Sequence, residues 1–288
     1  DYLQYLQETI PLNVADPPGV VCQGIQKSRR LALDFDIENF DTFVTWGSWN
    51  SAMHAAGAVC QAIDAVSSGE CRNAFCAIRP PGHHAGRRGQ TCDAPSLGFC
   101  LINNVAIGAK YAVLARGYER VAVVDFDVHH GNGTQDILAG DDHYRFISVH
   151  VYDERKYFFP GTGTGEEGIG NVLNIPIKRH SGSQAYLQVF ERKVIPELEI
   201  YQPQLLILSA GFDAHRDDPT RGLRLCSRDY LTITQLLLGV AWRHCGGKLV
   251  SVLEGGYDIS PRTAALQHSA RNHLTSLMGL DAPFSHEF

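Results

Sequence analysis

Short apolar runs rich in β-branched residues alternate along the chain with longer segments in which apolar residues recur at helical spacing. The short runs predict strands that begin near Asn73, Val121, Arg145, Asn171, Gln204 and Lys248. The longer segments, the fifth of them kinked or restarted near Pro196, predict helices over residues 1–10, 48–66, 103–116, 133–139, 183–201, 227–245 and 260–278. Strands that alternate with helices indicate an α/β fold, a mainly parallel sheet flanked by helices on both faces.

The segment 48–66 shows the helical pattern clearly. The stripe that we expect to face the core consists of Met53, Ala56, Val59, Ile63 and Val66. No internal repeat, low-complexity segment or linker divides the chain. Residues 1–288 are therefore predicted to form a single domain.

Ionisable residues gather where the strand that begins at Val121 ends. Two acids and two histidines, among them Asp125, Asp127 and His129, follow the apolar run within six positions, and glycines come next. An unpaired charge in a buried strand costs several kcal/mol, so these groups need compensation. In an extended chain these three residues point to the same side, where one metal ion would compensate them together. The alternative is a polar strand end whose groups satisfy one another.

Three other strands carry chemically active residues just beyond their ends. His83 and His84 follow the first strand in a rigid Pro-Pro-Gly frame, Asp213 follows the fifth, and Tyr257 follows the sixth after two glycines. In open parallel sheets, ligands bind beyond the carboxyl ends of the strands. We therefore expect these residues to meet the Asp125–His129 segment at one site.

The residue types at this site indicate metal-assisted hydrolysis of an amide. Asp127, His129 and Asp213 would give three protein ligands with one open position, and this set suits Zn²⁺, Fe²⁺ or Co²⁺. Such an ion lowers the pKa of a bound water to about 7 and polarises a carbonyl.

Two neighbouring groups would assist that reaction. His83 and His84 would transfer protons, and Asp125 and Asn132 are the natural partners to hold their imidazoles. The hydroxyl of Tyr257 would stabilise a developing oxyanion.

Composition excludes several other classes of protein. The net charge of −6 leaves no basic footprint for direct nucleic-acid binding, and no apolar run is long enough to span a membrane. The eight cysteines form no CxxC pair and several lie in apolar runs, which favours reduced thiols and an intracellular location. That location would be the nucleus or cytoplasm of a eukaryote, or the cytoplasm of a bacterium.

Six motifs carry a resemblance to a known family: Arg79 to Ala85, Gly98 to Cys100, Asp125 to Thr134, Phe158 to Gly161, Gly211 to His215 and Leu253 to Tyr257. From about residue 40 onward the chain resembles the zinc-dependent histone deacetylases, which have the arginase/deacetylase α/β fold. Asn132 and Glu254 resemble the class II branch and its bacterial amidohydrolase relatives.

The resemblance implies one Zn²⁺ per chain, bound by Asp127, His129 and Asp213. It also implies that Tyr257 hydrogen-bonds the substrate carbonyl and the tetrahedral intermediate. A structural K⁺ is implied near Asp125, Asp127, His129, Ser148 and Val149.

The same resemblance implies that His84 is the general base and then the general acid, with Asn132 beside it. His83, paired with Asp125, would supply electrostatic support. The channel for the acyl-lysine would be formed by Gly98, Phe99 and Phe159, and the substrate backbone would be held at its rim by Asp41.

Two departures from the family concern the edges of the domain. The segment between Ala85 and Gly98 is about six residues longer than expected, and we expect it at the mouth of the pocket. The family usually has a further strand and helix before the point where this chain starts. Two explanations are open: the N-terminal edge of the domain is truncated, or the sheet has lost an edge strand.

Three functions remain open on the sequence alone. The first is removal of acetyl or other acyl groups from lysines of histones or other proteins, in an oligomer or corepressor complex. The second is hydrolysis of small acetylated amines such as acetylpolyamines, which an acidic loop over residues 34–41 favours. The third is a catalytically silent binding module. Arginase-type hydrolysis is disfavoured because it uses two metals and more carboxylates.

Overall fold

The computed structural model describes residues 2–9, 41–155, 158–165 and 170–279. Residues 34–40 of the predicted acidic loop lie outside these ranges. Six strands form one sheet in which every neighbouring pair is parallel, in the order β1-β6-β5-β2-β3-β4. The strands are β1 (Asn73–Cys76), β2 (Val121–Asp125), β3 (Tyr144–Val151), β4 (Val172–Ile177), β5 (Leu205–Ala210) and β6 (Leu249–Leu253). The predicted α/β fold is confirmed.

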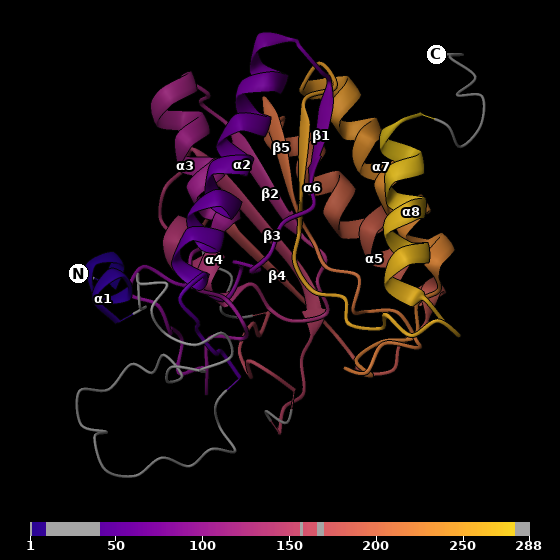
Figure 1. Cartoon of the computed structure of the whole chain (residues 1–288). Helices are drawn as coiled ribbons and strands as arrows, with labels where there is room; N and C mark the ends of the chain where they lie inside the picture. The colour runs from indigo at the N-terminus through magenta and orange to yellow at the C-terminus, as the bar shows by residue number, and fades with distance from the viewer. Residues whose placement is uncertain (1, 10–40, 156–157, 166–169, 280–288) are drawn as a thin grey trace.

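Helices cover both faces of the sheet (Figure 1). One layer contains α2 (Ser48–Ser68), α3 (Asn104–Arg116) and the short α4 (Asn132–Leu138). The other contains α5 (Ser183–Val189), α6 (Ile195–Tyr201), α7 (Ser227–His244) and α8 (Ala265–Leu277), while α1 (Tyr2–Thr9) lies apart near the first layer. Among the described residues, no helix is long and apolar enough to cross a membrane.

The central strand β2 is buried on both faces. Ala122 and Val124 belong to the core beneath the α5–α8 layer, whereas Val121 and Val123 belong to the core beneath α2 and α3. A strand covered on both sides can be apolar at every position, which explains the unbroken run in the sequence.

Three details of the helices differ from the sequence predictions or refine them. The predicted helix 183–201 changes to a π-helical turn, η2 (Phe190–Val194), just before Pro196, which lacks the N–H that a continuous helix needs. Met53 is 46% exposed, so its place in the core stripe was wrong; Ala52 faces inward instead, while Ala56 is buried as predicted. Helix α8 begins at Ala265, five residues later than predicted.

The sheet has a topological switch point between β2 and β5. These neighbouring strands pair directly, but the chain continues from β2 towards β3 on one side and from β5 towards β6 on the other. The connections after the two strands therefore diverge and leave a crevice at their carboxyl ends. The chain places Asp127 and His129 after β2 and Asp213 after β5, on the two sides of this crevice.

Candidate active site

Three ligand atoms from Asp127, His129 and Asp213 converge at the switch point, within 4.8 Å of one another. His129 Nδ1 lies 2.8 Å from Asp127 Oδ1 and 3.0 Å from Asp213 Oδ2. A ring nitrogen can donate only one proton, and the hydrogen bond goes to Asp127. Asp213 Oδ2 is left buried without a hydrogen bond. An orphaned carboxylate oxygen beside two further donors fits a metal ion.

The other carboxylate oxygens of the cluster are held by backbone N–H groups. Gly255 N donates to Asp127 Oδ2 over 2.8 Å, and Val128 N donates to Asp213 Oδ1 over 3.0 Å. A side chain at position 255 would put its Cβ 2.6 Å from Asp127 Oδ2, so the site requires glycine there. These contacts turn the remaining oxygens of both acids towards His129.

The electrostatics of the cluster also fit a bound cation. Burial, with the neighbouring carboxylate of Asp127 as the next cause, raises the pKa of Asp213 to about 7. Burial alone would lower the pKa of His129, but Asp213 and Asp127 outweigh it and raise the pKa to about 10. The two buried acids therefore hold a positive charge between them, which a divalent ion would supply in place of the imidazole proton.

A buried glutamate fixes the loop that carries the two adjacent histidines. Glu254 Oε2 accepts hydrogen bonds from the backbone N–H groups of Gly82 and His83 over 2.7 and 3.2 Å. Arg79 Nη1 in turn donates to the backbone carbonyl of Glu254 over 2.6 Å. Glu254 was not predicted to act in the site, although its position at the end of β6 matches the pattern of the other strand-end acids.

The two histidines have different partners and opposite pKa shifts. His83 Nδ1 lies 2.9 Å from Asp125 Oδ2, whereas His84 Nδ1 lies 2.7 Å from Asn132 Oδ1. Burial alone would lower the pKa of His83, but Asp125 and other nearby carboxylates raise it to about 10. Burial lowers the pKa of His84 well below its ordinary value, and His83 and His129 add to this effect. The structure thus places one charged and one neutral imidazole side by side, with ring centroids 3.9 Å apart.

The longer segment 86–97 contacts the partner of His84. Asn132 Nδ2 donates to the backbone carbonyl of Thr91 over 3.2 Å, which turns the amide oxygen towards His84. Arg87 anchors the segment to α4, because its Nε and Nη2 donate to the carbonyls of Asp136 and Ile137. This segment, which was predicted to lie at the pocket mouth, therefore orients the side chain of Asn132 inside the site.

Aromatic rings line the approach to the cluster. Phe159 meets the ring of His84 edge-on at 4.8 Å, and Phe99 lies 5.7 Å from Tyr257. Phe158, which the sequence analysis quoted only within a motif, stacks on His129 at 5.2 Å with the ring planes 14° apart. Phe99 is 43% exposed and so stands at the outer end.

Gly98 allows two of these rings to come close. Its φ of +53° favours glycine, and a Cβ there would overlap the ring of His84 and lie 2.8 Å from Phe159. Asp41 lies on the outer side of the same loop: its Oδ1 accepts a hydrogen bond from Thr42 Oγ1, which accepts one from Phe99 N over 2.9 Å. Gly98, predicted at the channel, and Asp41, predicted at its rim, therefore both lie next to the aromatic rings that line the approach to the cluster.

The residues named for a potassium site also lie close together. Asp125 and Ser148 are register partners on β2 and β3, and both side chains are fully buried. Ser148 Oγ lies 2.8 Å from His150 Nδ1, and Val149 is the next residue of the strand.

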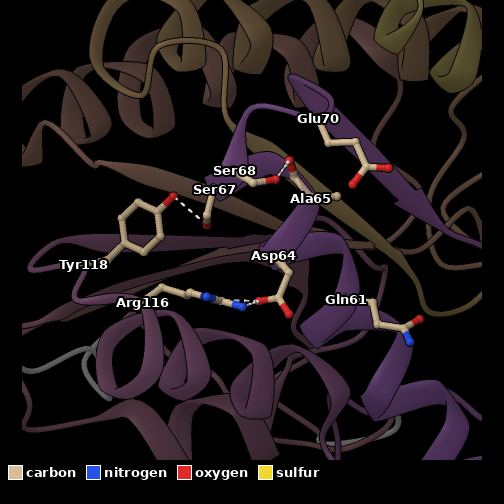
Figure 2. A pocket seen from close by; sticks show the side chains of 8 residues that line it. All are labelled: Gln61, Asp64, Ala65, Ser67, Ser68, Glu70, Arg116 and Tyr118. Atoms are coloured by element: carbon tan, nitrogen blue, oxygen red, sulfur yellow. Dashed lines mark hydrogen bonds and ion pairs between the residues drawn. The ribbon is translucent and has the colours of Figure 1, made fainter.

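A different cavity, of about 610 Å³, lies at the opposite end of the sheet (Figure 2). Residues from the C-terminal ends of α2 and α3 line it, including Asp64, Arg116 and Tyr118. No part of the metal-ligand cluster borders it, so it is separate from the candidate active site.

An open parallel sheet with a buried Asp-His-Asp cluster at its switch point, flanked by two adjacent histidines and a tyrosine, is typical of metal-dependent hydrolases of the arginase and deacetylase type. The sequence profile of the histone deacetylase domain matches residues 1–276. The chain therefore belongs to the histone deacetylase domain family.

Individual relatives agree with this assignment. The chain is 57% identical over 247 residues to type-2 histone deacetylase 2 of Dictyostelium discoideum, a match that covers 83% of this chain and 14% of that protein. It is 41% identical to a histone deacetylase-like amidohydrolase of Pseudomonas aeruginosa, over 74% of this chain and 55% of that one. The crystal structure of the HDA15 HD domain matches with a TM-score of 0.75 and 35% identity, over 85% of this chain and 67% of that chain. The matched region thus spans only part of the length of these curated relatives.

Proposed function

We propose that this chain is a zinc-dependent deacetylase domain that removes acetyl or related acyl groups from lysine side chains of histones or other proteins. The observation that carries the proposal is the convergence of three ligand atoms, one of them the orphaned Asp213 Oδ2, beside His84. Family membership and the names of relatives from several kingdoms support the same reaction class.

Asp127, His129 and Asp213 would hold the ion, and their nitrogen and oxygen donors suit zinc. When bound, Zn²⁺ would lower the pKa of a water molecule to about 7 and polarise the amide carbonyl. A structural K⁺ is proposed near Asp125, Asp127, His129, Ser148 and Val149, since the side chains of Asp125 and Ser148 are buried on adjacent strands.

His84 is proposed as the group that moves the proton. Its Nδ1 donates to Asn132 Oδ1 because the Asn132 amide hydrogens point to Thr91, so Nε2 carries the free lone pair. Its lowered pKa keeps the ring neutral and able to accept a proton from the attacking water. It would then deliver that proton to the leaving amine. His83, held positive by Asp125, would stabilise negative charge in the transition state.

Tyr257 is proposed to hydrogen-bond the substrate carbonyl. Burial raises the pKa of its hydroxyl well above the ordinary range, and the carboxylates of Asp213 and Asp127 raise it further. The hydroxyl therefore stays protonated at neutral pH and can donate to a developing oxyanion. Phe99 and Phe159 would flank the alkyl chain of the acyl-lysine. Gly98 leaves room for this arrangement, because a Cβ there would collide with His84 and Phe159.

The test is hydrolysis of an acetyl-lysine peptide by the protein before chelation, after chelation and after zinc is restored. We expect activity that is lost with the metal and returns with about one zinc per chain. If the zinc-loaded protein binds metal but hydrolyses neither the peptide nor an acetylpolyamine, the chain is a silent binding module and the proposal fails. Hydrolysis of the acetylpolyamine alone would replace it with the small-amine reaction.

A further inference from the structure

A cavity of about 590 Å³ opens directly beside Tyr257 and has no role in the reaction proposed above. Its walls are the loop that follows Asp213 and the segment that follows Tyr257, and they include Arg216, Arg221 and Ile259. Tyr257 belongs to both the cavity and the candidate active site, so the two are adjacent.

Two of the acids that line this cavity are already engaged by backbone N–H groups. Asp218, which is buried, accepts hydrogen bonds from the N–H groups of Tyr257 and Asp258 over 2.8 and 3.3 Å. Asp258 accepts one from Ala265 N over 3.0 Å at the start of α8. These carboxylates stabilise the walls, because the oxygens that accept these hydrogen bonds are directed towards the backbone.

The arginines of the cavity keep their charge available. Arg216 is 63% exposed and lies 3.7 Å from Asp217, which is 39% exposed, so the two make a weak surface pair. Within the described part of the chain, no carboxylate lies within ion-pair distance of the guanidinium of Arg221. The backbone of Arg221 is fixed, since its N–H donates to Asp218 O over 3.1 Å and its carbonyl accepts from Arg179 Nε over 3.3 Å.

A third arginine adds positive charge next to the cluster. The guanidinium of Arg179 lies 5.5 Å from the ring centre of Phe158, which itself stacks on His129. Gly222 lets this loop approach closely, because a Cβ there would lie 2.8 Å from Phe158. Arg179 therefore adds a positive charge beside the cavity, whose own lining holds Arg216 and Arg221 together with the acids Asp217, Asp218 and Asp258.

We propose that this cavity is a substrate subsite that binds an acidic residue, aspartate or glutamate, next to the acyl-lysine of a protein substrate. The carboxylate would pair with Arg221 and Arg216, and the exposed side chain of Ile259 would contact the aliphatic part of the neighbouring residue. The inference rests on the proposed deacetylase function and gives its substrate a charge. The same arginines repel cationic amines, so acetylpolyamines are poor ligands for this site.

The experiment compares two acetyl-lysine peptides of equal length that differ only in three flanking residues on each side, which are aspartate in one and lysine in the other. With the zinc-loaded protein at low salt, we expect kcat/KM to be about tenfold higher for the acidic peptide, and the difference to shrink at high salt. Arg221→Glu should abolish or reverse the preference. Arg192→Glu is the matched control, since it makes the same charge change on the exposed surface of η2, and should keep the preference.

Binding of fluorescent versions of both peptides to the same samples separates the inference from the proposed function. If neither peptide is hydrolysed but the acidic one binds more tightly and Arg221→Glu removes the difference, the subsite stands and the proposed reaction fails. If both peptides are hydrolysed and bound equally well, or if Arg192→Glu changes the preference as much as Arg221→Glu, the subsite is overturned.

Discussion

The two ends of the parallel sheet carry the same kinds of ionisable residue in opposite surroundings. At the carboxyl end, Asp127 and Asp213 are fully buried and share one imidazole nitrogen. At the amino end, Asp64 pairs with Arg116, whose Nε lies 2.6 Å from the carboxylate, and both side chains are about two-fifths exposed (Figure 2). In the Asp64–Arg116 pair the charges balance, because one acid meets one base at the surface. In the buried cluster they do not balance, because the two acids Asp127 and Asp213 share the single base His129.

The difference shows which feature marks chemistry in this fold. A cavity alone does not mark it, since the cavity at the amino end is at least as large as the one beside Tyr257. An excess of buried negative charge does mark the chemically active end, because a protein that folds around such charge must supply a cation. Substitutions at the two ends should therefore differ in their effects, and those at the buried acids should have the largest.

The largest effect is expected for Asp213→Ala. Removal of one of the two buried acids leaves two protein ligands, so stoichiometric zinc should be lost and hydrolysis of an acetyl-lysine peptide should fall to background. Metal analysis by mass spectrometry and a kinetic assay on the same sample give both values. Asp217→Ala, an exposed acid four residues later, is the control and should keep its zinc. Retention of one zinc per chain by Asp213→Ala would remove Asp213 from the ligand set.

A loss of two to three orders of magnitude in kcat is expected for Tyr257→Phe. The substitution deletes a single hydroxyl that donates to the oxyanion, and removal of one such donor usually costs about 10²–10³ in kcat. Zinc content should not change, because no atom of Tyr257 is among the three ligand atoms. A kcat that stays within a factor of three would exclude Tyr257 from the reaction.

The fold and the ends of its strands were predictable because their signals are local. An unbroken apolar run such as that of β2 indicates a strand covered on both sides, and the acids behind it stand out against the run. The parallel order then brings distant strand ends together without knowledge of any side-chain contact. At this edge of the sheet His83 lies 2.9 Å from Asp125, and His129 lies 3.0 Å from Asp213.

Contacts to backbone atoms were not predictable. The carbonyl of Thr91 orients Asn132, and the N–H groups of Gly82 and His83 hold Glu254, but every residue has such groups and none leaves a pattern in the sequence. Met53 was misplaced for a related reason. The helical spacing of the core stripe is met almost equally well by Met53 and by its neighbour Ala52, and in the packed structure Ala52 is the residue that is buried.

A smaller effect, about tenfold in kcat with little change in KM, is expected for Arg87→Ala. Arg87 fixes the segment 86–97 on α4, and this segment orients the amide of Asn132 that holds His84. Steady-state kinetics of Arg87→Ala and of its exposed neighbour Arg88→Ala, the control, measure the effect. If KM rises and kcat stays constant, the segment contacts substrate at the pocket mouth and does not act through Asn132.

The smallest effect is expected at the amino end of the sheet, for Asp64→Ala. This substitution removes the partner of Arg116 and an acceptor for the hydroxyl of Tyr111, but water can replace both contacts at this exposed position. Surface ion pairs contribute little to stability, so the melting temperature should stay within about 2 °C and decrease no further at high salt. Zinc content and kcat should equal those of the unaltered protein, because the cavity in Figure 2 has no residue in common with the metal cluster. A change in kcat with an unchanged melting temperature would mean that the amino end communicates with the site through the sheet, and the contrast between the two ends would then be wrong.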